Sequence, residues 1–354
     1  MAEHYSVPDL LHFATEVLQA AGLPEEPARI VAEGLLEADL YGHTTHGLAL
    51  LEDYVDELQA GTMTRTGKPK VLQDFGAIAR WDARRLPGIW TTALAVDEAH
   101  LRAGKFGLGA VAIAYSHHIG CLAAFLEKPA RKNIAVLVLS SDPSDAMVAP
   151  YGGITPVLTP NPIAVGIPAE PDPILIDIST SITTAGMCSR LRNEGKRLPG
   201  PWLVNQAGKA SDDPHVLNKG GAMLPIGGFD HGHKGFALGL MVEALTQGLS
   251  GYGRIEAPTQ WGAAVLVLAF ATEIFGNAEG FIEQVNDIIK SCQAATSIPG
   301  EAGVRIPGQH ALARKRDALK NGLTLYPGIA ESLERLAQRY TLITPAPVAR
   351  TMYC

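Results

Sequence analysis

Cysteine is scarce in this sequence of 354 residues, which has four scattered cysteines and no CxxC pair (Cys121, Cys188, Cys292 and Cys354). A disulfide framework and a cysteine-rich metal site are therefore excluded, and we expect a cytoplasmic chain with reduced thiols. The sequence also lacks any continuous apolar run of the roughly 18–20 residues that a membrane span requires. Its first residues include Glu3 and Asp9 and no apolar segment, so we expect no signal peptide.

Charged residues are few as well, at 18% of the chain, and they give a formal net charge of -7. This mild acidity offers no electrostatic reason for binding nucleic acid or an anionic membrane, and we expect neither as a partner. Hydrophobic residues make up 47% of the sequence, which is enough for a large core and excludes a disordered chain. An anionic ligand would have to be held by local groups, because the overall charge repels it.

The hydrophobic periodicity changes along the chain. At both ends apolar residues recur at helical spacing, whereas the middle alternates short apolar strands with helices, which predicts an α/β fold. We therefore predict a helical domain at 1–68 and 301–354, with an α/β domain inserted at 69–300. The predicted strands are 78–81, 108–114, 134–139, 164–167, 174–178 and 263–270, the main predicted helices are 10–18, 27–40, 48–58, 91–103, 236–246, 280–292, 309–320 and 329–339, and 191–224 is predicted to be an irregular connection.

Histidine is the most informative residue type. Six of the eleven histidines form three close pairs in glycine-containing segments (His43 with His46, His117 with His118, His231 with His233). Imidazole titrates near neutral pH, so it can both give and take a proton there. The pairs therefore indicate proton transfer or ligand binding, and chance clustering of structural histidines is the alternative.

The first pair lies in the segment Gly42–Gly47 (GHTTHG), between two predicted helices. His46 can act there as a general acid and base, and the neighbouring Thr45 can orient its ring. A structural interpretation is compatible with this one, because Thr44 or Thr45 can cap the following helix.

Two further segments fit a phosphate group. Gly227–Gly235 (GGFDHGHKG) combines four glycines with Lys234 at the start of a predicted helix, so its backbone can approach an anion closely. Ser116–Gly120 (SHHIG) lies between a strand and a predicted helix, whose first amide groups suit the same ligand. A flexible loop and an ordinary strand-to-helix connection are the respective alternatives.

Two motifs are associated with predicted strands. Gly107–Ala112 (GLGAVA) is similar to the dinucleotide fingerprint, but it enters an apolar strand instead of opening a helix, so we predict no Rossmann site there. Asp177–Ser181 lies at the end of a predicted strand. Its carboxylate and hydroxyls can bind a ribose or a nicotinamide amide, or they can cap a helix.

At these residues the sequence resembles the malate/L-lactate dehydrogenase family, which also contains ureidoglycolate, sulfolactate and diketogulonate oxidoreductases and the reductases of piperideine and pyrroline carboxylates. The matching segments occur in order along nearly the whole chain (39–54, 116–122, 151–168, 177–186, 225–254 and 305–308). The resemblance implies a non-Rossmann nicotinamide-binding fold with a mixed sheet, NAD or NADP as cofactor, and a homodimer or higher oligomer. The sequence does not distinguish NAD from NADP.

The resemblance also implies roles for individual residues. It makes His46 the proton donor and acceptor, with Thr45 in the position of a serine that belongs to a charge relay in the imine reductases. The cofactor-binding residues that it implies are His118, Ile119, Gly120, Cys121, Leu122, Asp177, Ile178, Ser179, His233, Lys234, Arg305, Pro307, Gly308 and Gln309.

Three positions depart from the family's pattern. Leu50 stands where an arginine meets the substrate carboxylate, Met187 where the imine reductases have a relay aspartate, and Pro160 where the family has a threonine. Because a bidentate arginine binds carboxylates strongly, we expect a different or less polar substrate, or another cation such as Arg190 or Arg192. The residues that we expect at the substrate are Thr159, Pro160 and Leu50.

We predict hydride transfer between NAD(P) and a small substrate, a 2-hydroxy acid similar to malate or lactate that is interconverted with its 2-oxo acid. A cyclic imino acid reductase, acting on piperideine or pyrroline carboxylate, is the alternative. A metal-dependent hydrolase is a rival because the paired histidines and Asp230 are zinc-type ligands. Lys234 beside them opposes a metal, and we expect none. A non-catalytic protein that keeps a dinucleotide site is the remaining alternative.

Overall fold

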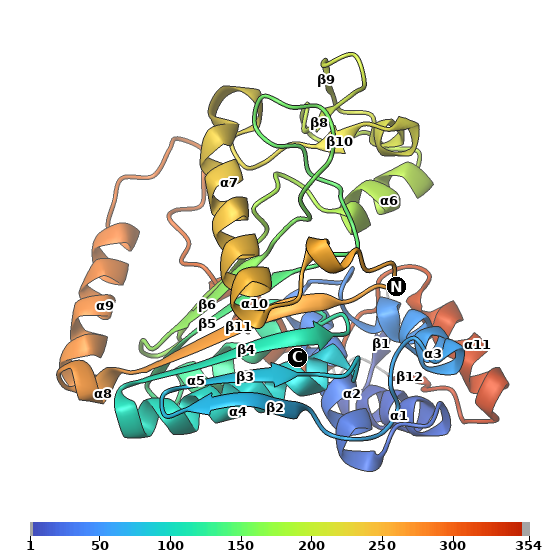
Figure 1. Cartoon of the computed structure of the whole chain (residues 1–354), viewed down its shortest axis with the longest axis horizontal. Coiled ribbons are helices and arrows are strands. Elements are labelled where there is room, and N and C mark those ends of the chain that lie inside the picture. The colour runs from blue at the N-terminus through green and yellow to red at the C-terminus, as the bar shows by residue number, and fades with distance from the viewer. Residues whose placement is uncertain (1–2, 349–354) are drawn as a thin grey trace, which may run out of the picture.

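A seven-stranded mixed sheet forms the centre of the computed structural model, which describes residues 3–348 (Figure 1). The strand order is β2-β3-β4-β11-β5-β6-β7, and neighbouring strands are antiparallel except β3 and β4. This sheet is not the parallel, doubly wound sheet of a Rossmann domain, which confirms the predicted α/β class with a mixed sheet. Its strands are β2 Lys70–Phe75, β3 Ile78–Asp82, β4 Leu108–Ser116, β5 Ile134–Ser141, β6 Ile163–Ile167, β7 Ile174–Ile178 and β11 Ala263–Ala271.

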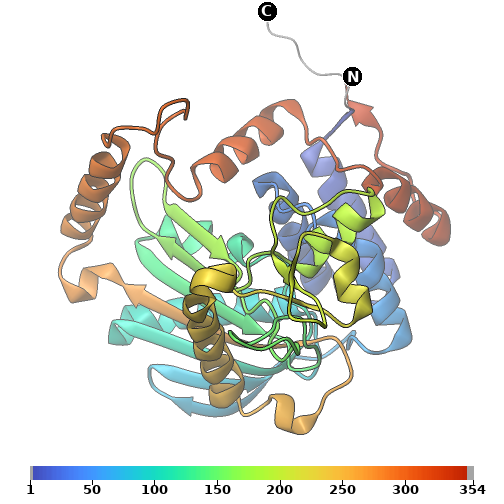
Figure 2. The same cartoon turned by 90° about the horizontal axis from the view of Figure 1, so that it is seen from above.

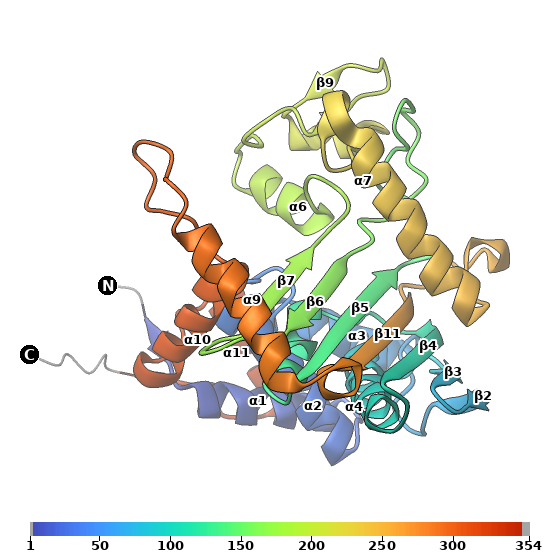
Figure 3. The same ribbon diagram turned by 90° about the vertical axis from the view of Figure 1, so that its left-hand side faces the viewer.

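Helices from both chain ends lie on one side of the sheet. Helix α4 (Gly88–Phe106) packs on β4 and β11, and α2 packs against α1, α4 and α10. Figure 2 shows the helices of the two chain ends, in blue and red, side by side, and Figure 3 shows α1, α2 and α4 below the sheet. One hydrophobic core runs through these helices into the sheet, so the predicted domain boundaries at 68/69 and 300/301 remain a prediction. Residues 349–354 of the predicted helical domain lie outside the described residues. The elements of the two ends are β1 His4–Tyr5, α1 Val7–Ala20, α2 Glu25–Tyr41, α3 Leu51–Ala60, α10 Gln309–Asn321, α11 Ile329–Tyr340 and β12 Pro347–Val348.

The opposite side of the sheet carries α7 (Gly228–Glu243), with α6 (Ala185–Asn193) and a three-stranded sheet beyond it (Figures 1 and 3). The predicted irregular connection at 191–224 is therefore only partly irregular. None of the helices between residues 3 and 348 combines the length and apolar character of a membrane span. The remaining elements are α5 Glu127–Ala130, β8 Leu203–Val204, β9 Ala210–Ser211, β10 Ala222–Met223, α8 Thr272–Phe275 and α9 Ala278–Gln293.

Local sequence explains several of these boundaries. Helix α1 begins after Ser6, whose side-chain oxygen accepts the backbone N–H of Asp9. Helix α4 ends at Gly107, whose φ of 81° is left-handed, so the GLGAVA segment continues as strand β4, as predicted. The GGFDHGHKG segment stands at the start of a helix, as predicted, and is not the flexible loop that was the alternative. It forms the N-cap and first turns of α7, in which Gly227 and Gly228 have left-handed φ values of 96° and 59° and His231 also departs from helical geometry.

The register of the sheet brings distant loops to one edge. The last residue of β4, Ser116, pairs with Ala263 at the start of β11, and Ala264 pairs with Ser141 at the end of β5. The first residue of β6 likewise pairs with the last residue of β7. Because neighbouring strands run in opposite directions, the segments that follow β4, β5 and β7 meet those that precede β6 and β11. These segments form the site described next.

Candidate active site

A cavity of about 300 Å³ opens at this edge of the sheet. Its walls are the segments just described, the turn Gly42–Gly47 and the start of α6. The structure therefore brings together residues from His43 to Ala263, about 220 positions apart in the sequence, which no local motif could show. The predicted site residues that line the cavity are His46, His118, Ile119, Gly120, Cys121, Leu122, Thr159, Pro160, Asp177 and Ser179.

The other predicted site residues lie outside the cavity wall. His233 and Lys234 are exposed on the first turns of α7. Leu50 packs against the hydrophobic core, and Ile178 is exposed. The segment Arg305–Gln309 runs beside the edge strand β7, where Pro307 accepts a hydrogen bond from the backbone N–H of Leu175 at 3.2 Å.

The glycines of GGFDHGHKG serve packing within the chain. A Cβ at Gly235 would lie 2.4 Å from the backbone nitrogen of Ile226 and 2.9 Å from the carbonyl oxygen of Thr180. The close backbone approach that the sequence predicts here is therefore an approach to the chain itself. The binding of cofactor by His233 and Lys234 stays a prediction.

The turn that carries His46 is anchored at several points. The N–H of Gly42 donates to the carbonyl of Asp39, that of His43 to the carbonyl of Ala38, and that of His46 to the carbonyl of His43. The Asp39 carboxylate accepts the N–H of Leu48 at 2.7 Å. A Cβ at Gly47 would lie 2.3 Å from that carboxylate, so only glycine fits there without a shift. These contacts fix the backbone on both sides of His46.

Asp39 itself is a buried carboxyl group. Its exposed fraction is 6%, and its Oδ1 atom has no hydrogen-bond partner among the described residues. Burial raises the pKa of Asp39 to about 7, although the Leu48 N–H and the charge of Arg190 act in the opposite direction. The turn of His46 therefore rests on a carboxyl group that changes charge near neutral pH.

His46 faces the cavity with one ring nitrogen held. Its Nδ1 atom lies 2.9 Å from the Thr45 hydroxyl oxygen, and the ring stacks at 6.0 Å on that of His118. Burial lowers the pKa of His46, the Asp177 charge raises it, and His43 lowers it again. A neutral imidazole whose Nδ1 is occupied by a hydroxyl keeps Nε2 for proton exchange with a ligand.

The ring of His118 is fixed by its neighbours. Its Nδ1 accepts the backbone N–H of Gly120 at 3.3 Å and lies 2.9 Å from the Tyr54 hydroxyl, and the ring stacks on Trp261 at 4.3 Å. Burial lowers the pKa of His118 well below its ordinary value, with smaller contributions from His46 and His117. A neutral ring that accepts at Nδ1 carries its proton on Nε2. His118 therefore provides a rigid, uncharged wall with one donor.

The second histidine pair divides between two roles. His117, next to His118, is fully buried outside the cavity wall, and its Nε2 lies 3.2 Å from a Glu57 carboxylate oxygen. Burial lowers the pKa of His117 to about 4. His117 is thus a structural residue, whereas its neighbour lines the site.

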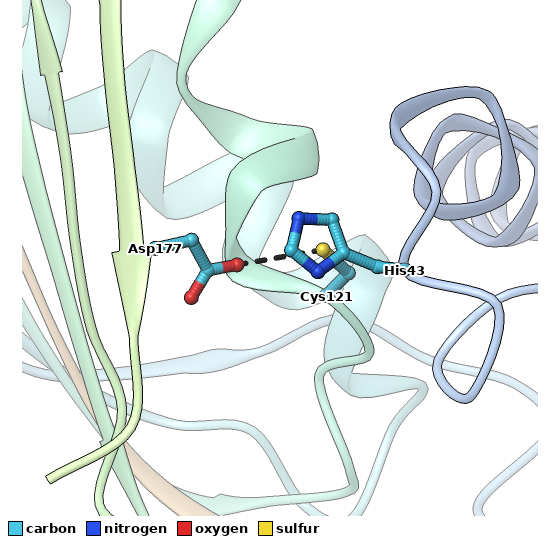
Figure 4. Close-up of side chains that lie close together, drawn as sticks. All are labelled: His43, Cys121 and Asp177. Carbon is cyan, nitrogen blue, oxygen red and sulfur yellow. Dashed lines mark hydrogen bonds between the residues drawn. The ribbon is translucent and has the colours of Figure 1, made fainter. Parts of the chain in front are cut away.

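Three side chains of different chemistry meet on one wall of the cavity. His43 comes from the turn, Cys121 from the segment after β4 and Asp177 from the end of β7 (Figure 4). One Asp177 oxygen accepts the Cys121 thiol at 3.4 Å and the backbone N–H of Ala123 at 2.8 Å. The alternative prediction, a cap of the helix that follows the strand, is not what Asp177 does, because Ala123 lies in the distant turn Leu122–Phe125 and α6 is capped by Thr184.

Several cavity residues had no signal that singled them out in the sequence. Asp142 and Asp145 lie in the segment after β5, and Trp261 precedes β11. Gly186 in the first turn of α6 packs on Thr45, since a Cβ there would lie 3.3 Å from the Thr45 Cβ. Polar residues directly after an apolar strand are a weak general signal, but the strand order is needed to place them at this edge.

Comparison with known proteins identifies the group to which such a site belongs. The sequence model described as malate/L-lactate dehydrogenase matches residues 5–334. The chain belongs to this family. It is 30% identical over 343 residues to a malate dehydrogenase of Pyrococcus abyssi, which covers 94% of this chain and 93% of that protein.

Two further similarities span the chain. The Δ1-pyrroline-2-carboxylate/Δ1-piperideine-2-carboxylate reductase of Pseudomonas syringae pv. tomato is 29% identical over 346 residues, which cover 94% of this chain and 96% of that protein. The solved structure of a malate dehydrogenase from Pyrococcus horikoshii OT3 has a TM-score of 0.87 and 27% identity, and covers 97% of this chain and 100% of that one. The resemblance predicted from the motifs is thus confirmed.

Family membership defines the class of enzyme. The chain is an NAD(P)-dependent dehydrogenase or reductase, and the dehydrogenases of this family use NAD or NADP. The prediction of an oxidoreductase is therefore confirmed, and the hydrolase and the non-catalytic binding protein are set aside.

Proposed function

We propose that this protein interconverts a small 2-hydroxy acid and its 2-oxo acid by hydride transfer with NAD or NADP, and that His46 is the proton donor and acceptor. The observation that carries the proposal is the position of His46. Its ring lines the cavity beside the segments implied to bind the cofactor, with Nδ1 at 2.9 Å from the Thr45 hydroxyl. Such an arrangement leaves a single nitrogen for the substrate.

The cavity wall fits a nicotinamide group. The ring of Trp261 and the side chains of Ile119 and Leu122 offer apolar contacts, and Ser140 and Ser179 offer hydroxyls for an amide. When bound, the nicotinamide accepts or supplies the hydride. The residues His118–Leu122 and Asp177–Ser179 would hold it against the sheet edge.

We propose that the substrate carboxylate binds at the N-terminus of α6. No Lys or Arg occurs among the described residues that line the cavity, and Leu50 does not replace the missing cation. The Thr184 hydroxyl caps α6 by accepting the N–H of Met187, which leaves the first amides, at Ala185 and Gly186, on the cavity wall. A helix N-terminus favours an anion. This site stands directly beside Thr45.

Arg190 supports this arrangement from behind. Its guanidinium donates to the Thr44 hydroxyl at 3.0 Å and stacks on the Tyr326 ring at 3.6 Å. It therefore ties α6 to the turn of His46 instead of entering the cavity. Met187, at the position of the imine reductases' relay aspartate, is exposed and lies outside the cavity wall.

The proton transfers follow from the charge of His46. In oxidation, neutral His46 removes the hydroxyl proton of the 2-hydroxy acid while the hydride leaves C2. In reduction, protonated His46 donates its Nε2 proton to the oxygen that becomes the hydroxyl. The Thr45 hydroxyl accepts from or donates to Nδ1 as the ring changes tautomer.

The test is reduced-nicotinamide absorbance with each cofactor in turn against a panel of 2-oxo acids, 2-hydroxy acids and cyclic imino acids. We expect turnover with a 2-oxo acid, and a loss of about 10²-fold or more in His46→Ala with cofactor affinity nearly unchanged. His215→Ala, at an exposed histidine outside the cavity, is the matched control. Equal turnover in His46→Ala would refute the assignment.

Cyclic imino acid reduction is the second candidate. Asp142, Asp145 and Asp177 line the cavity without a cation, and a protonated imine is a cation that these carboxylates would attract. The same panel separates the candidates, because turnover confined to the cyclic imines would replace the 2-oxo acid proposal.

The outer cofactor contacts form a separate proposal. We place the cofactor phosphates near His233 and Lys234 on α7 or near Arg305–Gln309 beside β7, where cations are exposed. Lys234→Ala should weaken cofactor binding, with Lys209→Ala as control, and unchanged affinity would exclude α7. Comparing NAD with NADP in the same titration identifies the cofactor that is used.

We further propose a cytoplasmic homodimer. Helix α9 is amphipathic in sequence, yet none of its residues is buried, and Phe75 on strand β2 is 81% exposed. Apolar faces of this kind are usually covered by a partner. Light scattering that gives the mass of one chain would contradict the dimer.

The described cysteines form no disulfide, in keeping with a reducing compartment. Cys354 lies outside the described residues.

A further inference from the structure

The wall shown in Figure 4 has the donor set of a zinc site. His43, Cys121 and Asp177 each offer one ligand atom, and these atoms all lie within 4.8 Å of one another. Donors around a tetrahedral zinc, with bonds of about 2.0–2.3 Å, lie roughly 3.3–3.8 Å apart. The thiol and the Asp177 oxygen, at 3.4 Å, already have this spacing. Because no two of the three atoms are farther apart than 4.8 Å, the half-buried His43 ring would have to approach by at most about 1.5 Å.

The ligand atoms are available to an ion. In the described part of the chain the His43 ring makes no hydrogen bond, and only one of the two Asp177 oxygens is used, by Cys121 and Ala123. The side of the cluster that faces the cavity leaves room for a fourth ligand. Three protein ligands with an open position are the arrangement of accessible zinc sites.

The charge of the cavity favours a cation. Among the described residues that line it there are three aspartates and no Lys or Arg. Burial and the Asp177 charge raise the pKa of the Cys121 thiol well above its ordinary value, so the thiol holds its proton in the metal-free protein. An ion that binds displaces this proton to solvent, and the Zn–S bond replaces the S–H bond.

We propose that His43, Cys121 and Asp177 bind Zn²⁺, and that the bound ion closes the cavity beside His46 and inhibits the enzyme. The proposal that Zn²⁺ binds here is argued from the donor geometry alone. The inhibition rests on the proposed function, because it requires that the cavity hold substrate and nicotinamide. Zinc is then a reversible inhibitor, and its removal by a chelator restores activity.

The first experiment uses Co²⁺ alone as a spectroscopic substitute for Zn²⁺ on the full, metal-free chain without cofactor or substrate. We expect a near-ultraviolet thiolate-to-cobalt band that saturates at one ion per chain and that Zn²⁺ abolishes. Cys121→Ser should eliminate the band, and His43→Ala should weaken Co²⁺ binding by at least about tenfold. Cys292→Ser, at an exposed thiol on α9, is the matched control and should keep the band.

A band that persists in Cys121→Ser, or that disappears in Cys292→Ser, overturns the site. The second experiment titrates Zn²⁺ into the activity assay, where the wild type should be inhibited and His43→Ala should need at least about tenfold more zinc. Full activity with zinc bound would contradict the proposed inhibition. If no substrate of the panel is turned over while the cobalt band appears, the proposed function is wrong and the proposed metal site is still supported.

Discussion

Asparagine at position 39 should make the protein more stable than the wild type above neutral pH. Burial raises the pKa of Asp39 from 3.8 to about 7 in the folded chain. The folded protein therefore binds this proton more tightly than the unfolded chain does. The free energy of unfolding is then highest below about pH 4 and falls as the pH rises to about 7, where the loss is complete.

The size of this effect follows from the two pKa values. Their difference corresponds to about 4 kcal/mol of unfolding free energy, as an order of magnitude. Asp39→Asn keeps an oxygen for the Leu48 N–H but places an amide at the position of Oδ1, which has no partner. An unsatisfied buried donor costs about 1–3 kcal/mol. We therefore expect a net gain of about 1–3 kcal/mol above neutral pH, and a net loss below about pH 5.

The assay is urea unfolding of both proteins at several values between about pH 4 and about pH 8, which includes the range between the unfolded and folded pKa values of Asp39. Asp287→Asn, at an exposed aspartate on α9, is the control and should follow the wild type. The two stability curves of wild type and Asp39→Asn should cross. Parallel curves would refute the argument, since they would mean that Asp39 carries the same charge in the folded and unfolded chains.

Three further predictions concern the turn of His46. Thr45→Val should lower kcat/KM by about tenfold or more, because it removes the hydrogen bond to Nδ1 of His46. Thr45→Ser keeps the hydroxyl and should keep most of the wild-type kcat/KM. Equal kcat/KM in the wild type and both variants would exclude a role for the hydroxyl. Because burial lowers the pKa of His46 below the ordinary 6.5 of imidazole, kcat/KM for oxidation should rise with pH around a midpoint below that value, and kcat/KM for reduction should fall around the same midpoint. A midpoint above the ordinary value would contradict the effect of burial. Gly47→Ala should cost about 1–3 kcal/mol of stability in urea, because its Cβ would lie 2.3 Å from the Asp39 carboxylate, and an unchanged midpoint would show that the turn can move.

The sequence was informative where one segment carries a whole signal. The apolar run of β11 and the helical spacing of α1 define their elements without reference to other parts of the chain. His46 and Thr45 are adjacent, so their pairing could be predicted from the motif alone. Strand β2 escaped prediction because all of its residues are exposed and it therefore shows no alternation of polar and apolar positions.

The rest of the site depends on the order of strands in space. Asp142 and Trp261 belong to one cavity only because β11 lies between β4 and β5, and nothing in either segment indicates this. Glycines misled in the opposite direction. Those of GGFDHGHKG indicated close backbone approach to an anionic ligand, whereas Gly235 allows a helix to pack closely on Ile226. A glycine in a sequence indicates that another group packs closely there, but it does not indicate whether that group is a ligand or the protein itself.

The place of β11 has a consequence for biosynthesis. Strands β4 and β5 are made early, but the strand that joins them begins more than a hundred residues later, at Ala263. Until then each presents an unpaired edge to any other extended chain. We therefore expect a nascent chain that ends before Ala263 to need protection by a chaperone, and the catalytic pocket to be completed late in synthesis, when this last central strand closes the sheet.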